Sequence, residues 1–274
     1  MKKKIKLKYL NIIIFIILLI SITIFTISIK NIIFWYIDSK ATIKELDNIS
    51  KNTTIKDISD TNDTEIIPPE NDIPSTDPYW SYISVNLIDV DFNNLLSINK
   101  DTIGWIQVPG TNVNYPFVKT TDNSYYLTHS FDKTYNSSGW VFLDYRNNFT
   151  NDKNTIIYAH GRYDNTMFGS LRNITTNGWL NNLDNFIIKI STPEENTLWQ
   201  VFSIYKIPTT SDYLEVSFAT EEEFQNFTNK LINRSIHTFN TKVSKNDKII
   251  TLSTCYNDDI KSVLHAKLIK KEKR

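Results

Sequence analysis

An uncharged apolar run near the N-terminus is the longest hydrophobic segment of the chain. Residues 9–29 read YLNIIIFIILLISITIFTISI, a length that suits the roughly 20 residues an α-helix needs to span a bilayer. Five lysines and no acidic residue precede the run, which predicts a cytoplasmic N-terminus and an extracytoplasmic body. A cleaved signal peptide would have a shorter apolar region of about 7–15 residues and a small-residue cleavage site. We therefore expect residues 1–30 to be a cytoplasmic tail and a single-pass anchor in the cell membrane.

A polar stretch from residue 31 to residue 79 follows the anchor. It is rich in Asp, Asn, Thr, Ser and Lys and contains IIPPENDIPSTDP. This composition is typical of a partly disordered or loosely helical spacer, with ATIKELDNI as a candidate short helix near its start. The extracytoplasmic domain is expected to occupy residues 80–274.

Beyond residue 80 the pattern changes to short apolar segments separated by turn residues. A short helix is expected at 90–98, VDFNNLLSI. Eight segments have the length and the β-branched and aromatic content of strands. They are residues 103–108, 114–118, 140–144, 154–160, 185–190, 198–207, 248–255 and 262–269. Many short strands at this spacing predict a mainly β domain, either a closed barrel or a sandwich.

One amphipathic helix is expected between these strands, at residues 221–235. Thr220 and Glu223 have the Thr-x-x-Glu spacing of a capping box. Phe224, Phe227 and Leu231 then recur at helical spacing and form one apolar stripe. We expect the stripe to pack on the core of the domain and not to bind a partner.

Charge and composition exclude some classes of function. The chain carries no formal net charge, but without the five N-terminal lysines 25 basic and 30 acidic residues remain, a net charge of −5. Such a body lacks the basic patch of a nucleic-acid-binding protein. No His, Cys and acidic residues have the spacing of metal ligands, and a single cysteine excludes a Cys-rich zinc site. We expect no metal and no other cofactor.

The single cysteine, Cys255, ends the apolar segment KIITLSTC. Alternation along a strand places Thr251, Ser253 and Cys255 on one face and Ile250 and Leu252 on the other. The end of a strand, where a loop begins, is a common place for an accessible nucleophile. A buried and inert cysteine is equally compatible with this residue taken alone, because Cys behaves as a small hydrophobe.

A thiol nucleophile needs a base or a cation beside it, because the thiolate is the attacking form. Among the four histidines, His160 is the best candidate, since it ends the segment NTIIYAH and precedes a loop. His129 lies in a turn-like stretch and is expected to be structural, and His237 is expected to be solvated. His265 lies in the last predicted strand, where we expect it to face the surface.

Several of these motifs together resemble class B sortases, the membrane-anchored cysteine transpeptidases of Gram-positive bacteria. TLSTC at 251–255, followed by VLHAKL, resembles their nucleophile strand and final strand. IGWIQVPGTNVNYPFVKTTDNSYYLTHSFD and GWVFLDYRN resemble their N-terminal part, and IIYAHGRYDNTMFGSL resembles their histidine segment. The resemblance covers about residues 87–269.

The resemblance implies an eight-stranded sortase-type β-barrel with N-terminal helices and a helix inserted before the nucleophile strand. It implies that Cys255 cleaves the C-terminal sorting signal (NPxTx- or LPxTG-like) of secreted proteins through a thioester, and that His160 is the acid and base. An amine of a peptidoglycan precursor or of a pilin would resolve the thioester. By the same match, the backbone N–H of Tyr256 is a candidate oxyanion donor. The residues that would line the substrate groove are Asn114, Val118, Tyr158, Ser253 and Tyr256.

Lys261 stands where the family carries an arginine at the start of the last strand. Lysine offers a flexible point charge in place of a rigid fork of donors, so Lys261 is both the third catalytic candidate and a departure from the family. Arg162 or Arg234 is an alternative source of the arginine. Two other hypotheses stay open, a pilin-polymerising sortase and a non-catalytic sortase-like module that binds sorting signals. A papain-like protease does not fit, because His160 precedes Cys255 in the chain.

Overall fold

The computed structural model describes residues 2–70, 72–255 and 260–274. It divides into two compact units, Met1–Ala41 and Thr42–Arg274. The first unit belongs to the helix α1 (Lys2–Asn52), which is long and apolar enough to cross a membrane by length and composition. The large apolar side chains of the first unit, from Tyr9 to Ile37, are exposed, as a bilayer-embedded helix requires. The direction in which the helix would cross a membrane stays a prediction.

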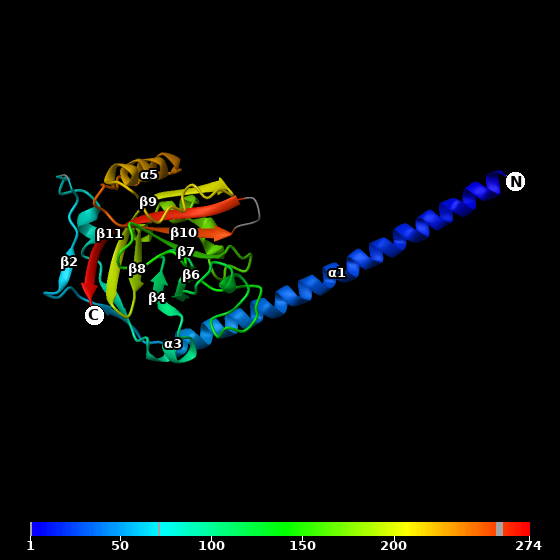
Figure 1. The fold of residues 1–274 in the computed structure, drawn as a ribbon, viewed down its shortest axis with the longest axis horizontal. Helices are drawn as coiled ribbons and strands as arrows, with labels where there is room; N and C mark the ends of the chain where they lie inside the picture. The colour runs from blue at the N-terminus through cyan, green and yellow to red at the C-terminus, as the bar shows by residue number, and fades with distance from the viewer. Residues whose placement is uncertain (1, 71, 256–259) are drawn as a thin grey trace. The chain divides into compact units, whose positions relative to one another are not determined.

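Eight strands of the second unit close into a β-barrel (Figure 1). They are β4 (Thr102–Gln107), β5 (Asn114–Val118), β6 (Phe142–Leu143), β7 (Asn154–His160), β8 (Ile187–Ser191), β9 (Glu195–Pro208), β10 (Ile249–Cys255) and β11 (Ile260–Lys273). Their order is β10-β7-β6-β5-β4-β8-β9-β11, and pairing of β10 with β11 completes the ring. Only the β5–β6 and β7–β10 pairs are parallel among these. The predicted eight-stranded barrel is confirmed.

Three further short strands precede the barrel in the chain. β1 (Ile55–Ile58) pairs with β3 (Leu87–Val90), and β2 (Thr64–Ile66) pairs with β11 beside the ring. β1 and β2 lie in the stretch that we expected to be a loose polar spacer. The structure corrects that description for residues 55–66, because their backbone groups pair with other strands.

A buried lysine holds the segment around β2 on the barrel. The side chain of Lys270, in β11, has no exposed surface. Its Nζ donates to Asp60 Oδ1 at 2.6 Å and to the carbonyl oxygens of Ile83 and Val85 at 2.8 and 2.7 Å. A buried ammonium group needs such partners, so Lys270 depends on the residues that precede the barrel.

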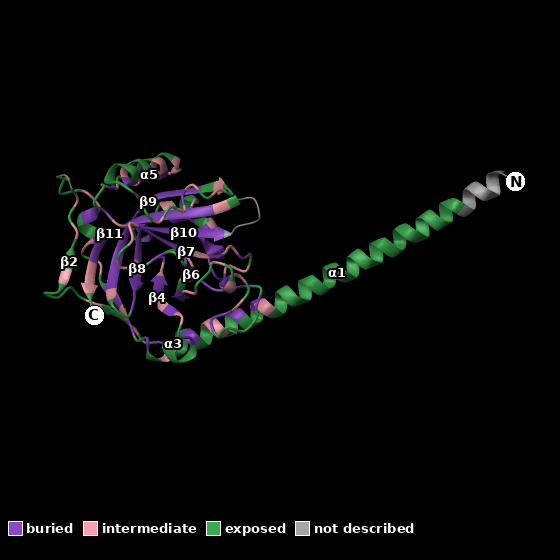
Figure 2. Ribbon diagram, viewed as in Figure 1, coloured by how far each residue is buried: buried purple, intermediate pink, exposed green. Residues whose placement is uncertain are grey.

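The sheet carries an apolar cluster on each face near β10 and β11. Ile250, Leu252 and Leu264 belong to the main cluster, and Ile249 and Val263 belong to a second cluster. The second cluster includes residues of the helix α5 (Glu221–Arg234), which covers this face of the sheet. Figure 2 shows the barrel strands largely buried and the outer side of α5 exposed.

The predicted caps and stripe of α5 are both present. Thr220 Oγ1 accepts a hydrogen bond from the backbone N–H of Glu223 at 3.1 Å, and Glu223 Oε2 accepts one from the backbone N–H of Ala219 at 2.6 Å. Phe224 and Phe227 are buried, as the apolar stripe predicts. The helix therefore ends near the predicted residue and packs on the domain that it was expected to cover.

Short helices fill the connections. α3 confirms the short helix expected near residues 90–98, although the first of these residues ends β3. The short helices in the described residues are α2 (Tyr79–Tyr82), α3 (Asn93–Ile98), η1 (Tyr125–Leu127), η2 (Gly169–Asn173), α4 (Asn177–Leu180) and η3 (Leu183–Phe186).

Candidate functional site

The carboxyl ends of β7 and β10 bring His160 and Cys255 side by side. The two strands are parallel, and their register pairs Ile249 with Asn154 at one end and Cys255 with His160 at the other. Neighbouring strands lie about 4.8 Å apart, so the backbones of these two residues are adjacent. The side chain of Cys255 lies outside what the structure describes. Two candidates that are distant in the sequence are thus neighbours in the sheet.

β11 adds Lys261 on the other side of Cys255. β10 and β11 are antiparallel, and their register pairs Ser253 with Val263. Continuing this register by two residues aligns Cys255 with Lys261. His160, Cys255 and Lys261 therefore belong to three neighbouring strands and lie at the same end of the barrel.

A backbone carbonyl orients the half-buried imidazole of His160. Nε2 lies 2.8 Å from the carbonyl oxygen of Leu127. Because a carbonyl oxygen only accepts hydrogen bonds, Nε2 carries the hydrogen. In the neutral ring Nδ1 is then the basic nitrogen, and it is the one available to exchange a proton with a substrate.

The surroundings of His160 favour the neutral imidazole. Burial is the largest influence and lowers its pKa, and the hydrogen bond to Leu127 acts in the opposite direction. The positive charges of Arg162 and Lys261 lower the pKa further. The influence of Lys261 is the smallest of these causes.

The two arginines considered as substitutes for the family arginine are both paired with carboxylates. Arg162 Nη2 lies 3.0 Å from Asp164 Oδ2, and both side chains are nearly buried. Arg234 Nη1 donates to Asp212 Oδ1 at 3.0 Å at the end of α5. Lys261, which is half-buried, is therefore the cation that β11 presents beside Cys255.

Tyr158 and Ser253 form the next aligned pair of β7 and β10 with side chains on the same face as the candidates above. The hydroxyl of Tyr158 donates to Asp144 Oδ2 at 2.9 Å, and its ring is half exposed. Ser253 is buried, and its Oγ lies 2.9 Å from the hydroxyl oxygen of Tyr213. Sequence reasoning missed Asp144 and Tyr213. An acid that ends the apolar segment WVFLD was the only available signal for Asp144.

The other expected groove residues fall in different surroundings. Asn114 is exposed at the start of β5, and its Oδ1 accepts a hydrogen bond from Trp105 Nε1 at 2.6 Å. Val118 ends the same strand but is fully buried. It belongs to the main apolar cluster and offers no exposed surface to a groove. Tyr256 lies outside the described residues.

His265 corrects an expectation, because it is fully buried and does not face the surface. The hydroxyl of Thr251 donates to Asn154 Oδ1 at 2.8 Å, so its oxygen accepts the hydrogen of His265 Nδ1 at 2.9 Å. His265 Nε2 then accepts from the hydroxyl of Tyr205 at 2.8 Å. The expectation was wrong because α5 covers this face of β11, which the pattern of β11 alone does not reveal.

The remaining two histidines lie outside β7, β10 and β11. His129 stacks on Tyr125 with 4.0 Å between the ring centroids, as a structural residue would. His237, expected to be solvated, is half-buried and packs against Phe186 and Phe239 with ring centroids 5.8 and 4.8 Å away.

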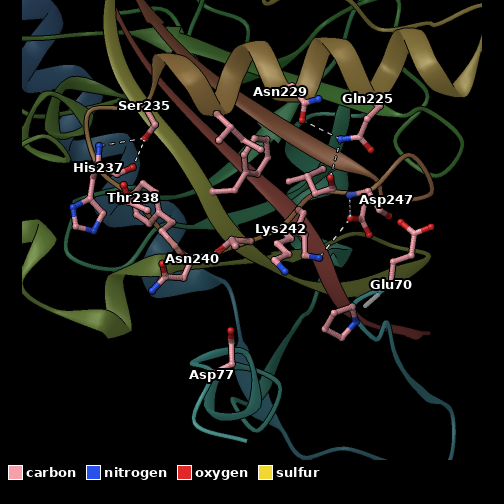
Figure 3. Close-up of a pocket in the computed structure, with 18 residues that line it drawn as sticks. Glu70, Asp77, Gln225, Asn229, Ser235, His237, Thr238, Asn240, Lys242 and Asp247 are labelled. Atoms are coloured by element: carbon pink, nitrogen blue, oxygen red, sulfur yellow. Dashed lines mark hydrogen bonds and ion pairs between the residues drawn. The ribbon is translucent and has the colours of Figure 1, made fainter. Parts of the chain in front are cut away.

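A pocket of about 660 Å³ lies between α5, the segment 235–247 and residues 69–77 (Figure 3). Its lining includes Lys267, which pairs with Ile249 at the start of β10. Cys255 ends that strand, about 20 Å away at the usual rise per residue. The pocket is therefore separate from the candidate site. Across residues 2–70, 72–255 and 260–274, no group of three or more His, Cys, Asp or Glu side chains is arranged to hold a metal ion.

Comparison with known proteins identifies the family. Residues 106–269 match the model of the Sortase domain. Sortase B of Listeria monocytogenes is 36% identical over 166 residues, which cover 60% of this chain and 67% of the relative. Sortase B of Staphylococcus aureus is 35% identical over 184 residues, covering 65% of this chain and 75% of the relative.

Solved structures agree with the sequence matches. Sortase B from Bacillus anthracis in complex with AAEK1 superposes with a TM-score of 0.66 at 29% identity, covering 87% of this chain and 99% of that chain. The Staphylococcus aureus sortase B–substrate complex has a TM-score of 0.61 at 34% identity, covering 65% and 84%. The chain therefore belongs to the sortase family of transpeptidases, and within that family to class B.

Proposed function

We propose that the chain cleaves the C-terminal sorting signal of secreted proteins and joins the cleaved protein to an amine of the cell wall. Cys255 is the nucleophile of this proposal and His160 is its acid and base. The observation that carries it is the pairing of His160 with Cys255 at the ends of β7 and β10, with Lys261 near the start of the neighbouring strand β11. All three residues also fall inside the Sortase-domain match at 106–269.

In the first half-reaction, the thiol of Cys255 gives its proton to Nδ1 of the neutral His160, and the resulting thiolate attacks the carbonyl carbon of the scissile peptide bond. The carbon–nitrogen bond breaks, and the protonated Nδ1 of His160 gives its proton to the leaving amine. A thioester between Cys255 and the secreted protein remains.

In the second half-reaction, the nitrogen of the acceptor amine attacks the thioester carbonyl carbon and loses a proton to Nδ1 of His160. The carbon–sulfur bond breaks, and the thiolate of Cys255 is regenerated. The hydrogen bond between Nε2 and Leu127 supports this role, because it leaves Nδ1 as the nitrogen that exchanges protons in both steps.

Lys261 offers its ammonium group to the substrate carbonyl or to the oxyanion, at the position where the family uses arginine. If lysine makes a weaker charged contact than arginine, the transition state loses about 2–4 kcal/mol of stabilisation, which is the scale of losing one oxyanion donor. That corresponds to a rate lower by roughly 30- to 1000-fold than with an arginine. The proposed enzyme is thus slow unless its own substrate favours a point charge.

The proposed substrate is a peptide with an Asn-Pro-x-Thr-x-like signal, which the class B resemblance favours. Asn114, Tyr158 and Ser253 are the proposed groove residues, and the backbone N–H of Tyr256 is the proposed oxyanion donor. One similar structure is a sortase B–substrate complex, and another is sortase B complexed with triglycine. These relatives support a peptide substrate and an amine acceptor in general terms.

The proposed location is the cell membrane, with the N-terminus in the cytoplasm and the barrel outside. The apolar part of α1 and the lysines that precede it support this topology. An anchored enzyme of this kind meets secreted proteins while they still carry their sorting signals.

A non-catalytic module that binds sorting signals is the second candidate, and Lys261 is the observation that favours it. Arg162 and Arg234 are both paired with carboxylates, so neither is an evident replacement for the missing fork of donors. A pilin-polymerising sortase differs from the main proposal only in its acceptor amine.

The test incubates the full chain, in detergent, with a panel of sorting-signal peptides and measures the intact protein by mass spectrometry. Cys255→Ala is the matched negative control, and Lys261→Arg is run in parallel. An acyl adduct on the parent protein that is absent from Cys255→Ala is the expected result. Addition of a peptidoglycan-derived or pilin-derived amine then identifies the acceptor by the mass of the product.

Two other results would change the conclusion. An adduct that forms only on Lys261→Arg would indicate an enzyme weakened by its lysine. A folded protein that binds peptide but forms no adduct in either version would refute the transpeptidase proposal and support the binding module.

A further inference from the structure

The C-terminal part of α1 belongs to the same compact unit as the barrel. The unit begins at Thr42, so residues 42–52 of the helix are part of the folded body. Thr42 has no exposed surface, and Ile49 is buried in the main apolar cluster. Residues 31–41 of the same helix separate this stretch from the anchor that we propose to place in the membrane.

Residues 125–140, here called the strap, form a loop that folds back on itself. The backbone N–H of Asn136 donates to the carbonyl of Thr128 at 2.9 Å, and that of Trp140 donates to the carbonyl of Tyr126 at 2.8 Å. A β-bridge joins His129 to Tyr135, one residue further toward the tip than the Thr128–Asn136 hydrogen bond. The outgoing arm of the strap is thus held in register with its returning arm.

The outgoing arm carries the carbonyl that orients His160. Leu127 accepts the Nε2 hydrogen of His160 at 2.8 Å, and its neighbour Thr128 is held by Asn136. The direction of the Leu127 carbonyl therefore depends on the conformation of the strap. It follows that the strap determines which nitrogen of His160 carries the hydrogen.

Two side chains of α1 hold the strap, one turn of helix apart. Thr42 Oγ1 accepts a hydrogen bond from Asn136 Nδ2 at 3.1 Å, and both residues are buried. Glu45 Oε1 accepts the backbone N–H of Asp132 at 2.9 Å, at the tip of the strap. The backbone N–H of Phe131 also faces the Glu45 carboxylate. The helix α1 thus makes hydrogen bonds to both the tip and the returning arm of the strap.

We propose that Thr42 and Glu45 are positioning residues for His160, and that they act through the strap and the carbonyl of Leu127. This inference rests on the proposed function of His160 as acid and base. The C-terminal end of α1 then helps to position the catalytic histidine, in addition to connecting the barrel to the anchor. A catalytic group displaced by about 1 Å can lose up to about 100-fold in rate, so a loosened strap has a measurable effect.

The test uses the full chain in detergent with three substitutions. Thr42→Val removes the hydroxyl with little change of shape, and Glu45→Met removes both carboxylate oxygens with little change of length. Asp47→Asn is the matched control, because Asp47 lies on the same helix but is exposed and pairs only with Lys51 among the described residues. Thr42→Ser restores the hydroxyl and serves as the rescue variant.

Thr42→Val and Glu45→Met are each expected to lower kcat about tenfold and to leave KM within about twofold, because substrate binding does not depend on the nitrogen that carries the hydrogen. Thr42→Ser and Asp47→Asn are expected to keep the parent values. Thermal unfolding of each protein fixes an assay temperature at which all of them are folded.

An independent measurement uses nitrogen NMR of labelled histidine. The parent is expected to show neutral His160 with the hydrogen on Nε2, and Thr42→Val and Glu45→Met are expected to show a mixture of both tautomers. Because this readout needs no turnover, it tests the coupling even if the proposed transpeptidase activity is absent. Unchanged tautomers in both variants, or an equal loss of kcat in Asp47→Asn, would overturn the inference.

Discussion

Acid should destabilise the barrel through His265, which the structure buries in its neutral form. Burial is the main cause and the charge of Arg234 a lesser one, and together they lower the pKa of His265 to about 3 from its usual value of 6.5. Its Nδ1 hydrogen is donated to Thr251 and its Nε2 accepts from Tyr205. A second proton on Nε2 would meet the hydrogen of the Tyr205 hydroxyl, so the charged ring does not fit this network.

The sign and size follow from proton linkage. Between the pKa of the unfolded chain and that of the folded chain, the unfolded state binds one more proton, so stability falls as the pH falls. Each pH unit in that window costs about 1.36 kcal/mol, and the whole window from pH 6.5 to about 3 costs roughly 5 kcal/mol. Between pH 7 and pH 4 the contribution of His265 is about 3 kcal/mol.

The assay is urea unfolding of the full chain in detergent, followed by tryptophan fluorescence at pH 7, 5.5 and 4. His265→Gln keeps a donor and an acceptor but does not titrate, and the carboxylates are common to both proteins. The parent should lose about 3 kcal/mol more than His265→Gln between pH 7 and pH 4. Equal losses in the two proteins would refute the reasoning that His265 is buried and neutral.

Three further changes test other parts of the structure. Lys261→Met should raise the pKa of His160 in an NMR titration, because the ammonium group is one of the cations that lower it, and an unchanged pKa would contradict their proximity. Lys270→Met should lower the free energy of unfolding by about 3 kcal/mol, since two buried carbonyls lose their donor while Asp60 is 45% exposed and returns to water. The more exposed Lys271→Met is its control and should cost less than about 1 kcal/mol in the same unfolding experiment. Thr220→Ala should cost about 1 kcal/mol by removing the cap of α5, and Thr220→Ser should restore most of it.

Much of the barrel and of α5 could be predicted from local patterns. Each of the eight barrel strands overlaps a predicted apolar segment, although β9 and β11 extend beyond theirs to 14 residues, and the Thr220 cap and apolar stripe define α5. The strands β1 and β2 were not predicted, since they have only four and three residues and lie in a polar stretch of the chain. They form because the edge of β11 and the strand β3 supply backbone partners, which no local pattern reports.

The sequence predicted which strand ends carry the candidate residues, but it did not predict how these residues are arranged in space. His160 and Cys255 each end an apolar segment, and family resemblance joined them with Lys261. The parallel register of β7 and β10 is what makes His160 and Cys255 adjacent. The carbonyl of Leu127 that orients His160 comes from a loop whose sequence gives no sign of this role.

The sequence by itself determined which residues alternate, where the eight barrel strands and α5 lie, and which residue types are able to do thiol chemistry. These properties follow from the backbone geometry and side-chain chemistry of neighbouring residues. The tertiary structure alone decided what covers each face. α5 covers the polar face of β10 and β11, so the hydrogen-bonded network around His265 is buried. Val118 is buried in the main apolar cluster. Burial depends on contacts between distant segments, and alternation fixes only which side chains share a face, not what they meet there.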